Sequence, residues 1–497
     1  MANAPLPTSP TSAMAHEVEL KLHVDPGDLA QLAALPDLRT RAHGGPAIGR
    51  LRTVYFDTPD LRLFGRGIAL RLRHDGARRI QGLKTVNASP SGDTAAVAVR
   101  REWEWSIEGD TPDLARIDAE GAGALVPQDA RGALVPIFVT DFQRTAWLVR
   151  LNAQTSIEVA IDDGTVEAGS RASRISEVEL ELKSGRIGHL FALARELHRA
   201  VPLRIGIESK AELGYRLVDG RPPMPVLPEP LALSPLSTVA EAFRHIVRHG
   251  LRQLLANEPC ALSGGEAEGL HQIRVALRRL RTAIRLFGPV IASPQTEPLL
   301  CEIRRLSDQL RPARAWDVLA AAPLPPTLAA AITEGRRGPA EQAVAALRDP
   351  RCTALILDLG VWLEEGLWHA DADAATRALL DHPMAELAGP WLTARHAKAR
   401  KAAPDDAERL RRRLRKLRYA VEFFRGLYPP DAARPYGTAL DAVLDTLDAA
   451  HDAASNAKLL AKREHRAAKA MERHAQRQCK DLPERYRAFR DAQPFWG

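Results

Sequence analysis

Short runs that alternate between charged and apolar residues constrain this chain more than any other feature of its sequence. The first run, residues 16–22, has the period of a β-strand, so its charged side chains share one face and its aliphatic side chains the other. The charged side chains are those of Glu17, Glu19 and Lys21. Carboxylates are hard oxygen ligands for Mg²⁺ or Mn²⁺, and lysine binds phosphate as a point charge. Such a face suits a metal–polyphosphate complex, although a solvated strand face has the same pattern.

The alternation recurs in runs that are far apart in the sequence. They are residues 69–73, 101–105, 156–164 and 176–183. Their polar faces carry Glu and Arg almost exclusively, and rows of like charge repel one another. Closing the strands into a tunnel with the charges inward would set the Arg rows opposite the Glu rows. A helix at 187–200, with apolar residues at helical spacing, would then cover the outer face.

Charge and composition divide the chain into two parts. With 497 residues it is too long for one typical domain. Residues 1–220 have a net charge of −2, residues 221–497 have +9, and a stiff proline-rich segment separates them. Strand patterns stop there, and helical periodicity follows. We therefore predict an α+β protein with a disordered extension at 1–14, a sheet domain at 15–220, a linker at 221–231 and an all-α domain at 232–497.

Other sequence features favour a cytoplasmic protein. No apolar run reaches the ~20 residues that span a bilayer, so we expect no membrane association. The first fifteen residues lack the charged and apolar regions of a signal peptide. The cysteines, at positions 260, 301, 352 and 479, have neither disulfide nor zinc-site spacing and are expected to be reduced thiols.

The helical half contains a row of cations on one helix. In residues 270–287, His271 and four arginines fall within an arc of about 80° on a helical wheel, beside an apolar stripe. The arginines are Arg274, Arg278, Arg281 and Arg285. Most charge runs are solvated faces, but those usually contain Glu to pair with Arg, and this segment has no acidic residue. Like charges therefore repel there unless an anion binds.

A second copy of this helix lies about 137 residues later. Residues 408–424 align with the first copy and contribute Arg411, Arg415 and Arg418. The period is too long for a solenoid repeat, so we predict two similar helical bundles that face each other and form one basic surface. Few aromatic residues accompany the arginines, which makes nucleic-acid binding by base stacking unlikely to be their role.

The first half resembles the CYTH, or triphosphate tunnel metalloenzyme, family over roughly residues 14–219. The elements that carry the resemblance are Glu17-x-Glu19-x-Lys21, Tyr55-Phe56-Asp57-Thr58, the Leu-Arg-Leu-Arg run at 70–73, Lys84, Arg144, the Glu177/Glu179 strand and Ser209-Lys210. The resemblance implies an eight-stranded antiparallel tunnel that acts on triphosphates with Mg²⁺ or Mn²⁺.

The second half resembles the CHAD family over roughly residues 232–495. The resemblance rests on the HQIRVALRRLRTAIRLF run and its second copy, RRLRKLRYAVEFF. It implies binding of inorganic polyphosphate. The second copy departs from the first in having Glu408 where the first has His271, so a metal role for His271 is not expected.

Together the two resemblances imply roles for named residues. Metal ligands are expected to be Glu17, Glu19, Asp162, Glu177 and Glu179. The cations expected to bind the substrate are Lys21, Arg52, Arg71, Arg73, Lys84, Arg144 and Lys210. Catalytic roles are assigned to Lys84, Glu102 and Glu104. Polyphosphate is expected to contact His271, Arg274, Arg278, Arg281, Arg285, Arg411, Arg415 and Arg418.

The leading functional hypothesis is an inorganic triphosphatase that hydrolyses tripolyphosphate to pyrophosphate and phosphate. No P-loop or nucleophile motif is present, so an ordinary NTPase is disfavoured. Two alternatives stay open at this point. One is a tunnel enzyme acting on another triphosphate, such as thiamine triphosphate or a nucleoside triphosphate, including adenylate cyclase chemistry. The other is a polyphosphate-binding protein without catalysis, which could associate with polyphosphate granules.

Overall fold

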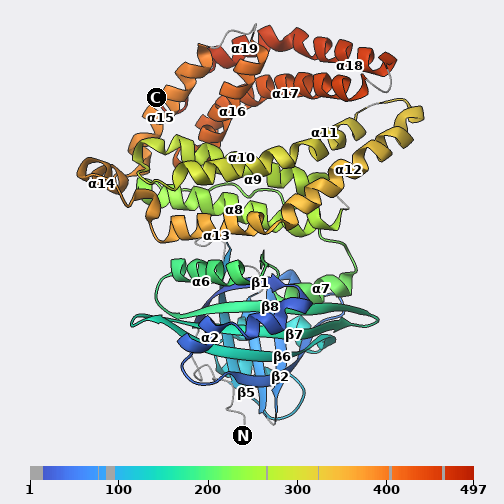
Figure 1. Ribbon diagram of the computed structural model, residues 1–497, viewed down its shortest axis with the longest axis vertical. Coiled ribbons are helices and arrows are strands. Elements are labelled where there is room, and N and C mark those ends of the chain that lie inside the picture. The colour runs from blue at the N-terminus through green and yellow to red at the C-terminus, as the bar shows by residue number, and fades with distance from the viewer. Residues whose placement is uncertain are drawn as a thin grey trace. The chain divides into compact units, whose positions relative to one another are not determined.

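The computed structural model describes residues 15–76, 78–85, 96–264, 267–322, 324–401, 406–461 and 465–497 (Figure 1). The expected extension at 1–14 lies outside the described residues. The chain forms two compact units. The first comprises residues up to 224 together with 350–366, and the second comprises 225–349 and 367–497. The change from one unit to the next at 224/225 falls within the proline-rich segment, and the segment 350–366 packs with the sheet rather than with the other helices.

The first unit is built around one antiparallel sheet, with nine strands in its described residues. The strands are β1 (Ala15–Val24), β2 (Ala47–Asp57), β3 (Ile68–Asp75), β4 (Arg78–Thr85), β5 (Val97–Ser106), β6 (Val135–Asn152), β7 (Thr155–Ala168), β8 (Arg171–Ser184) and β9 (Leu203–Gly206). Their order is β5-β4-β3-β2-β6-β7-β8-β1-β9, and β5 also pairs with β1. Because β1 pairs with both β5 and β8, the sheet curls until eight strands form a ring of paired neighbours. The expected curled antiparallel sheet is confirmed, and β9 is an addition that the sequence patterns did not predict.

Register separates a charged inner face from an apolar outer face. Paired residues of antiparallel strands share a face, and Lys21 lies opposite Glu179. The apolar residues of the alternating runs point the other way: Leu70 and Leu72 are buried in one outer cluster with Ile117 of α4. Short helices of this unit are α1 (Leu29–Ala33), α2 (Pro36–Arg41), α3 (Arg62–Gly65), α4 (Leu114–Ala119) and α5 (Gln128–Arg131).

Two longer helices cover another part of the outer face. The helix α6 (Ile187–Ala200) has the predicted bounds and contacts β1 and β8. Against it packs α13 (Pro350–Glu364), where the ring of Phe191 lies so close to Gly360 that an added Cβ would meet it at 2.2 Å. Arg195 of α6 donates to Asp358 of α13 at 2.6 Å. These contacts explain why residues 350–366 belong to the sheet unit.

Aromatic residues fill part of the inner face. The helix α7 (Lys210–Asp219) contacts β6, β7 and β8 and places Tyr215 in a buried cluster. Its ring lies 5.1 Å from that of Phe138, which stacks on Tyr55 at 4.4 Å. The aromatic cluster also buries Phe142, beside which the charged residues of the inner face begin.

The second unit is helical, as expected. Its helices are α8 (Val239–Ser263), α9 (Ala267–Leu286), α10 (Thr296–Gln309), α11 (Arg311–Ala320), α12 (Ala329–Arg348), α14 (Ala374–Asp381), α15 (Met384–Arg400), α16 (Ala407–Phe424), α17 (Pro430–Leu460), α18 (His465–Gln478) and α19 (Leu482–Asp491). The offset of 137 residues that relates the basic runs also brings α9 onto α16, α10 with α11 onto α17, and α12 onto α18. The related helices α9 and α16 contact each other, as do α11 and α17.

Two further expectations concern membranes and thiols. Among the described helices, none combines the length and the apolar character needed to cross a membrane. All four cysteines are free thiols.

A glycine on β7 tests the register of the sheet. A Cβ at Gly164 would lie 2.2 Å from the carbonyl oxygen of Asp141 and 2.4 Å from the Cα of Phe142, so the backbone of β6 would have to move. We predict that Gly164→Ala destabilises the sheet unit by about 1–3 kcal/mol. Faster hydrogen exchange in peptides from β6 and β7 would report it. The control Gly132→Ala, whose Cβ would meet nothing within 4 Å, should leave exchange unchanged.

Candidate functional site

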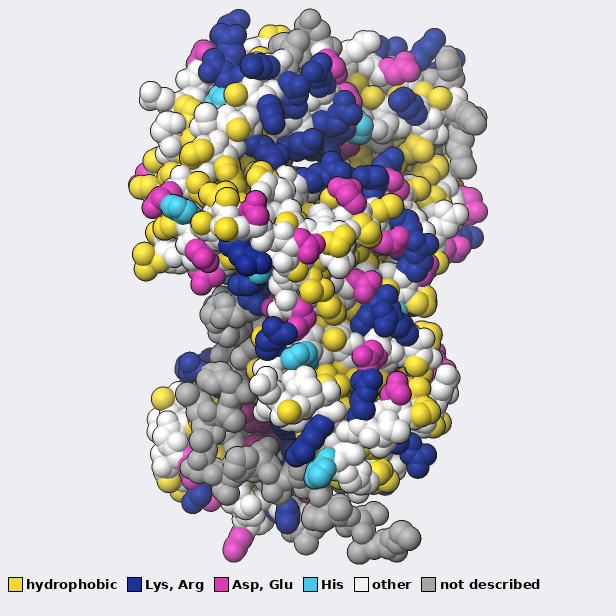
Figure 2. Space-filling view, turned by 60° about the vertical axis from the view of Figure 1, so that its left-hand side comes forward, with side chains coloured by type: hydrophobic (Ala, Val, Ile, Leu, Met, Phe, Trp, Pro, Cys, Tyr) yellow, Lys and Arg dark blue, Asp and Glu magenta, His cyan; other side chains and the backbone are white. Residues whose placement is uncertain are grey.

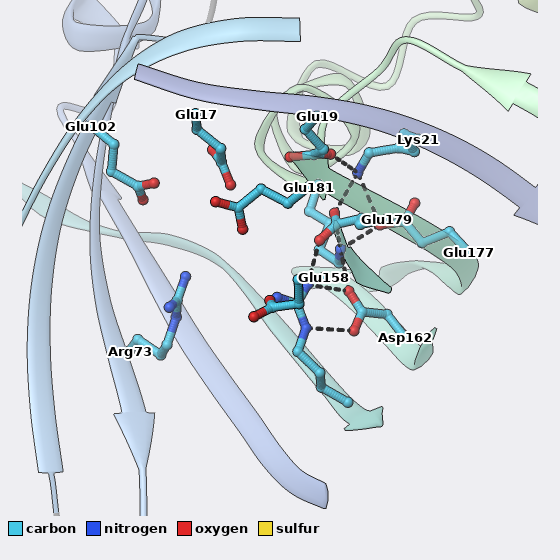
Figure 3. Close-up of polar contacts among 12 residues, drawn as sticks. Glu17, Glu19, Lys21, Arg73, Glu102, Glu158, Asp162, Glu177, Glu179 and Glu181 are labelled. Atoms are coloured by element: carbon cyan, nitrogen blue, oxygen red, sulfur yellow. Dashed lines mark hydrogen bonds and ion pairs between the residues drawn. The ribbon is translucent and has the colours of Figure 1, made fainter. Parts of the chain in front are cut away.

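Three carboxylates from two neighbouring strands converge on the inner face (Figure 3). Asp162 of β7 lies opposite Glu177 of β8, and Glu179 follows two residues later on the same face. Each contributes an oxygen, and these oxygens all lie within 4.8 Å of one another. Asp162 and Glu177 are buried. Hard divalent cations such as Mg²⁺ and Mn²⁺ take carboxylate oxygens, so this set of donors fits such an ion.

Lys210 is held against these carboxylates by the start of α7. Ser209 caps the helix by accepting a hydrogen bond from the backbone N–H of Glu212, which fixes Lys210 as the first helical residue. The Lys210 Nζ lies 2.6 Å from Asp162 and 2.7 Å from Glu179, and it also contacts the third carboxylate. The same ammonium stands 4.9 Å from the centre of the Phe142 ring.

Two further cations complete the group. The Lys21 Nζ donates to Glu177 at 2.9 Å and to Glu179 at 3.0 Å. Arg144 donates from Nε and Nη2 to the two oxygens of Asp162 at 2.8 and 2.6 Å, and it contacts Glu179 as well. A bidentate arginine fixes the orientation of the carboxylate as well as its charge. Three cations and three carboxylates therefore form one compact network.

Burial and charge shift the pKa values of the inner carboxylates in opposite directions. Burial alone would raise the pKa of Glu179, but the three cations hold it well below its usual range. The pKa of Glu177 is also lowered, because Lys21 and Lys210 outweigh its burial. Glu19 differs: burial, followed by repulsion from nearby carboxylates, raises its pKa to about 7. The network thus keeps its own carboxylates ionised, whereas Glu19 lies where negative charge is in excess.

The opposite wall carries the arginine row. Arg71 contacts Glu102 and donates to Glu104 at 2.7 Å, and Arg73 lies 3.4 Å from Glu104. Lys84 lies 3.5 Å from Glu102, its neighbour across β4 and β5. Although burial alone would raise the pKa of Glu104, Arg73 and Arg71 lower it to about 2. Acids and bases are thus paired on this wall too.

Further carboxylates lie between the two walls. Figure 3 shows Glu17 and Glu181 there, with Glu19 and Glu158 close by. Glu17 contacts Lys84 from the opposite wall, so the two walls are bridged by an ion pair. Glu181 lies opposite Glu158 on one side and opposite Glu19 on the other. Sequence reasoning did not name Glu158 or Glu181 as site residues, although both continue the alternation of their strands.

Most of the residues expected in the tunnel site are brought together, but not all in the expected grouping. Glu17 and Glu19 lie outside the set of three convergent carboxylates and contact Lys84 and Lys21 instead. Arg52 is exposed and pairs across strands with His74 and Asp141, out of phase with the inward-facing arginines. The alternation of β2 therefore places Arg52 on the outer face, away from the other expected substrate-binding cations.

The two basic rows of the helical unit lie on neighbouring helices. Arg278 of α9 donates to the hydroxyl of Tyr419 on α16 at 3.3 Å, and Arg279 forms an ion pair with Glu422 at 2.6 Å. Figure 2 shows a dense group of Lys and Arg side chains over this unit. Burial and nearby arginines, Arg314 foremost, lower the pKa of His271 to about 4, so this imidazole is neutral near pH 7.

The sequence matches two known families. Residues 15–215 match the model of the CYTH domain, and residues 245–461 match the model of the CHAD domain. A protein of Haemophilus influenzae named inorganic triphosphatase is 34% identical over 206 residues. That match covers 41% of this chain and 55% of the relative, so the chain spans only about half the length of that protein.

Solved structures resemble each half. The CHAD domain from the plant Ricinus communis is 30% identical and covers 54% of this chain and 98% of its own, with a TM-score of 0.47. The Hippeastrum protein HpAC1, described as having a dominant triphosphatase activity, is 18% identical and covers 43% of this chain and 98% of its own, with a TM-score of 0.29. PptA from Streptomyces chartreusis is 20% identical, covers 51% and 98%, and has a TM-score of 0.36.

Metal binding to the three carboxylates can be tested without any enzymatic assay. We predict that Glu177→Gln weakens Mn²⁺ binding by about 10- to 100-fold, because an amide offers one neutral oxygen in place of a carboxylate. Titration followed by the EPR signal of free Mn²⁺ measures this. The control Asp163→Asn removes a charge from the neighbouring position, where the side chain faces outward and pairs with Arg174. Equal affinities of the two variants would refute the assignment.

Proposed function

We propose that this chain, a CYTH domain followed by a CHAD domain, hydrolyses tripolyphosphate to pyrophosphate and phosphate and binds inorganic polyphosphate through its helical part. The observation that carries the first half of the proposal is the network of Asp162, Glu177 and Glu179 with three cations inside a curled sheet. A chain of phosphates carries alternating needs for cations along its length, and the inner face offers them on both walls. The name of the Haemophilus influenzae relative supports the same activity.

The three carboxylates would hold Mg²⁺ or Mn²⁺. When bound there, such an ion would neutralise phosphate charge and favour the attack of water on phosphorus. Lys210 and Lys21 now contact the same carboxylates, so they are placed to turn to phosphate oxygens once another cation takes these carboxylates. Arg144 would keep Asp162 in position through its two hydrogen bonds.

The opposite wall would bind the remaining phosphates. Arg71, Arg73 and Lys84 are paired with Glu102 and Glu104 in the described structure, so their charges are already oriented into the interior. Their fixed positive charge would stabilise the negative charge that develops on the departing pyrophosphate. Because Glu102 and Glu104 hold these cations, we assign to them a positioning role in catalysis.

One activity screen tests the proposal. Phosphate release is measured with Mg²⁺ or Mn²⁺ on tripolyphosphate, ATP, thiamine triphosphate and long-chain polyphosphate. We expect tripolyphosphate to be the best substrate and Glu179→Ala to lose activity by orders of magnitude while retaining its circular-dichroism spectrum. Activity confined to a nucleotide or to thiamine triphosphate would redirect the assignment to another tunnel enzyme. No hydrolysis of any of the four would support a protein that only binds polyphosphate.

The arginine wall generates a separate prediction. Arg73→Gln should lower kcat/KM for tripolyphosphate by roughly 10- to 100-fold, because one donor to the developing charge is lost. Arg50→Gln is the matched control, since Arg50 also lies in a strand and pairs with a carboxylate, but its side chain is 79% exposed. Steady-state kinetics of both variants, with protein concentration set by absorbance, decide the matter. Similar losses in the two variants would remove Arg73 from the site.

The helical part should bind long polyphosphate without metal. Its arginines recur about once per helical turn of ~5.4 Å, so several can contact one phosphate chain. Each contact releases a counterion, and the affinity of the whole chain in EDTA should therefore fall steeply with salt. We also predict weaker binding to duplex DNA of equal charge, because stacking groups are scarce beside the arginines. Fluorescence anisotropy at several salt concentrations measures both, and salt-independent affinity would contradict this account.

A further inference from the structure

The two basic helices are related by the internal repeat, but their neighbours differ in charge. Each is flanked by the helix that follows it: α9 by α10 and α11, and α16 by α17. On α17, Asp441 and Asp448 lie within reach of the α16 arginines. At the positions 137 residues earlier, α10 and α11 carry Arg304 and Arg311. One half of the repeat thus supplies acids where the other half supplies bases.

Asp448 neutralises the second row. Its carboxylate accepts from Arg415 Nη2 at 2.6 Å and lies 3.3 Å from Arg411 Nη1. Glu408 also pairs with Arg411, at 2.9 Å, and Asp441 lies 4.0 Å from Arg418. Each of the three arginines of this row therefore has a carboxylate partner from its own bundle.

The first row has no such partners. Within the described part of the chain, Arg274, Arg278, Arg281 and Arg285 form no ion pair with a carboxylate. Arg274 reaches only the carbonyl oxygen of Ser307 at 3.4 Å, and its buried Nε has no hydrogen-bond partner. Burial, together with Arg278, Arg311, Arg314 and Arg415, lowers the pKa of Arg274 to about 10. Cations gathered in this way are stabilised by an external anion more than cations that already have carboxylate partners.

We propose that the first row, joined by Arg304, Arg311 and Arg314, is the primary seat for polyphosphate, and that Asp448 competes with phosphate for Arg411 and Arg415. This inference rests on the proposed binding of polyphosphate by the helical unit. It adds three cations of α10 and α11 to the binding surface and gives its two halves unequal tasks. The first half holds the phosphate chain, whereas the second engages it only where phosphate displaces a carboxylate.

The added cations are tested first, on the full chain in EDTA with sodium polyphosphate of defined length. Arg304→Gln with Arg311→Gln should weaken binding at least about tenfold and make the salt dependence shallower by about two contacts. The control removes two exposed cations of other helices, Arg348→Gln with Arg477→Gln, and should change affinity little. Equal losses in both double variants would show that only net charge matters and would overturn the proposal.

The competitor is tested by removing its charge. Asp448→Asn should tighten polyphosphate binding by about two- to fivefold, the range set by a partly exposed ion pair. Asp431→Asn is the matched control, because Asp431 pairs with Arg434 at 3.1 Å on the same helix at a highly exposed site. Unchanged or weaker binding by Asp448→Asn, with normal thermal melting, would mean that Asp448 positions the arginines instead. If the unsubstituted chain binds no polyphosphate, both this inference and the helical part of the proposed function fail; if it binds and the variants match their controls, only this inference fails.

Discussion

Pairing of opposite charges on the inner face of the sheet is the interaction on which the rest of the sheet unit depends. Lys21 and Lys210 are only 4% and 9% exposed, and an isolated ammonium at that depth would be strongly unfavourable. Both are tolerated because carboxylates from β7 and β8 surround them. Removing one member of such a network leaves the others buried without a partner, which is why the charges constrain one another. The strands must keep their register for the network to exist.

This constraint links the fold to its chemistry. A protein interior that already contains unpaired demand for both signs is a place where a metal ion and a polyanion can enter together with little net change in charge. The aliphatic outer face, covered by helices such as α6, provides the rigid support for the charged inner one. Function at this site is therefore a property of the whole curled sheet rather than of one loop.

Much of this architecture could be predicted because alternation assigns a face to each residue. The rule also shows where the prediction failed. Arg52 shares its phase in β2 with Val54 and Phe56, which pack in the outer cluster, so the same rule would have placed it outside. Glu158 and Glu181 share the phase of the site residues on their strands and were nevertheless passed over.

Contacts between distant segments could not be read in the same way. The strand β9 is only four residues long and offers too short a pattern to detect. The repeat identified both basic helices, but the charges opposite them come from α10, α11 and α17, whose faces depend on how the bundles pack. Likewise, nothing in the sequence of α13 indicates that its partner is α6 rather than its neighbours in the chain.

That partnership has a consequence for how the protein is made. The match to the CHAD domain includes α13, yet the helix packs with a sheet whose last strand ends at Gly206. A ribosome must therefore synthesise more than a hundred further residues before α6 receives its cover. At the usual rates of elongation this takes roughly ten seconds, during which Phe191 and its apolar neighbours face the surroundings of the nascent chain. Chaperone binding to α6 during translation is the natural requirement of this order of synthesis.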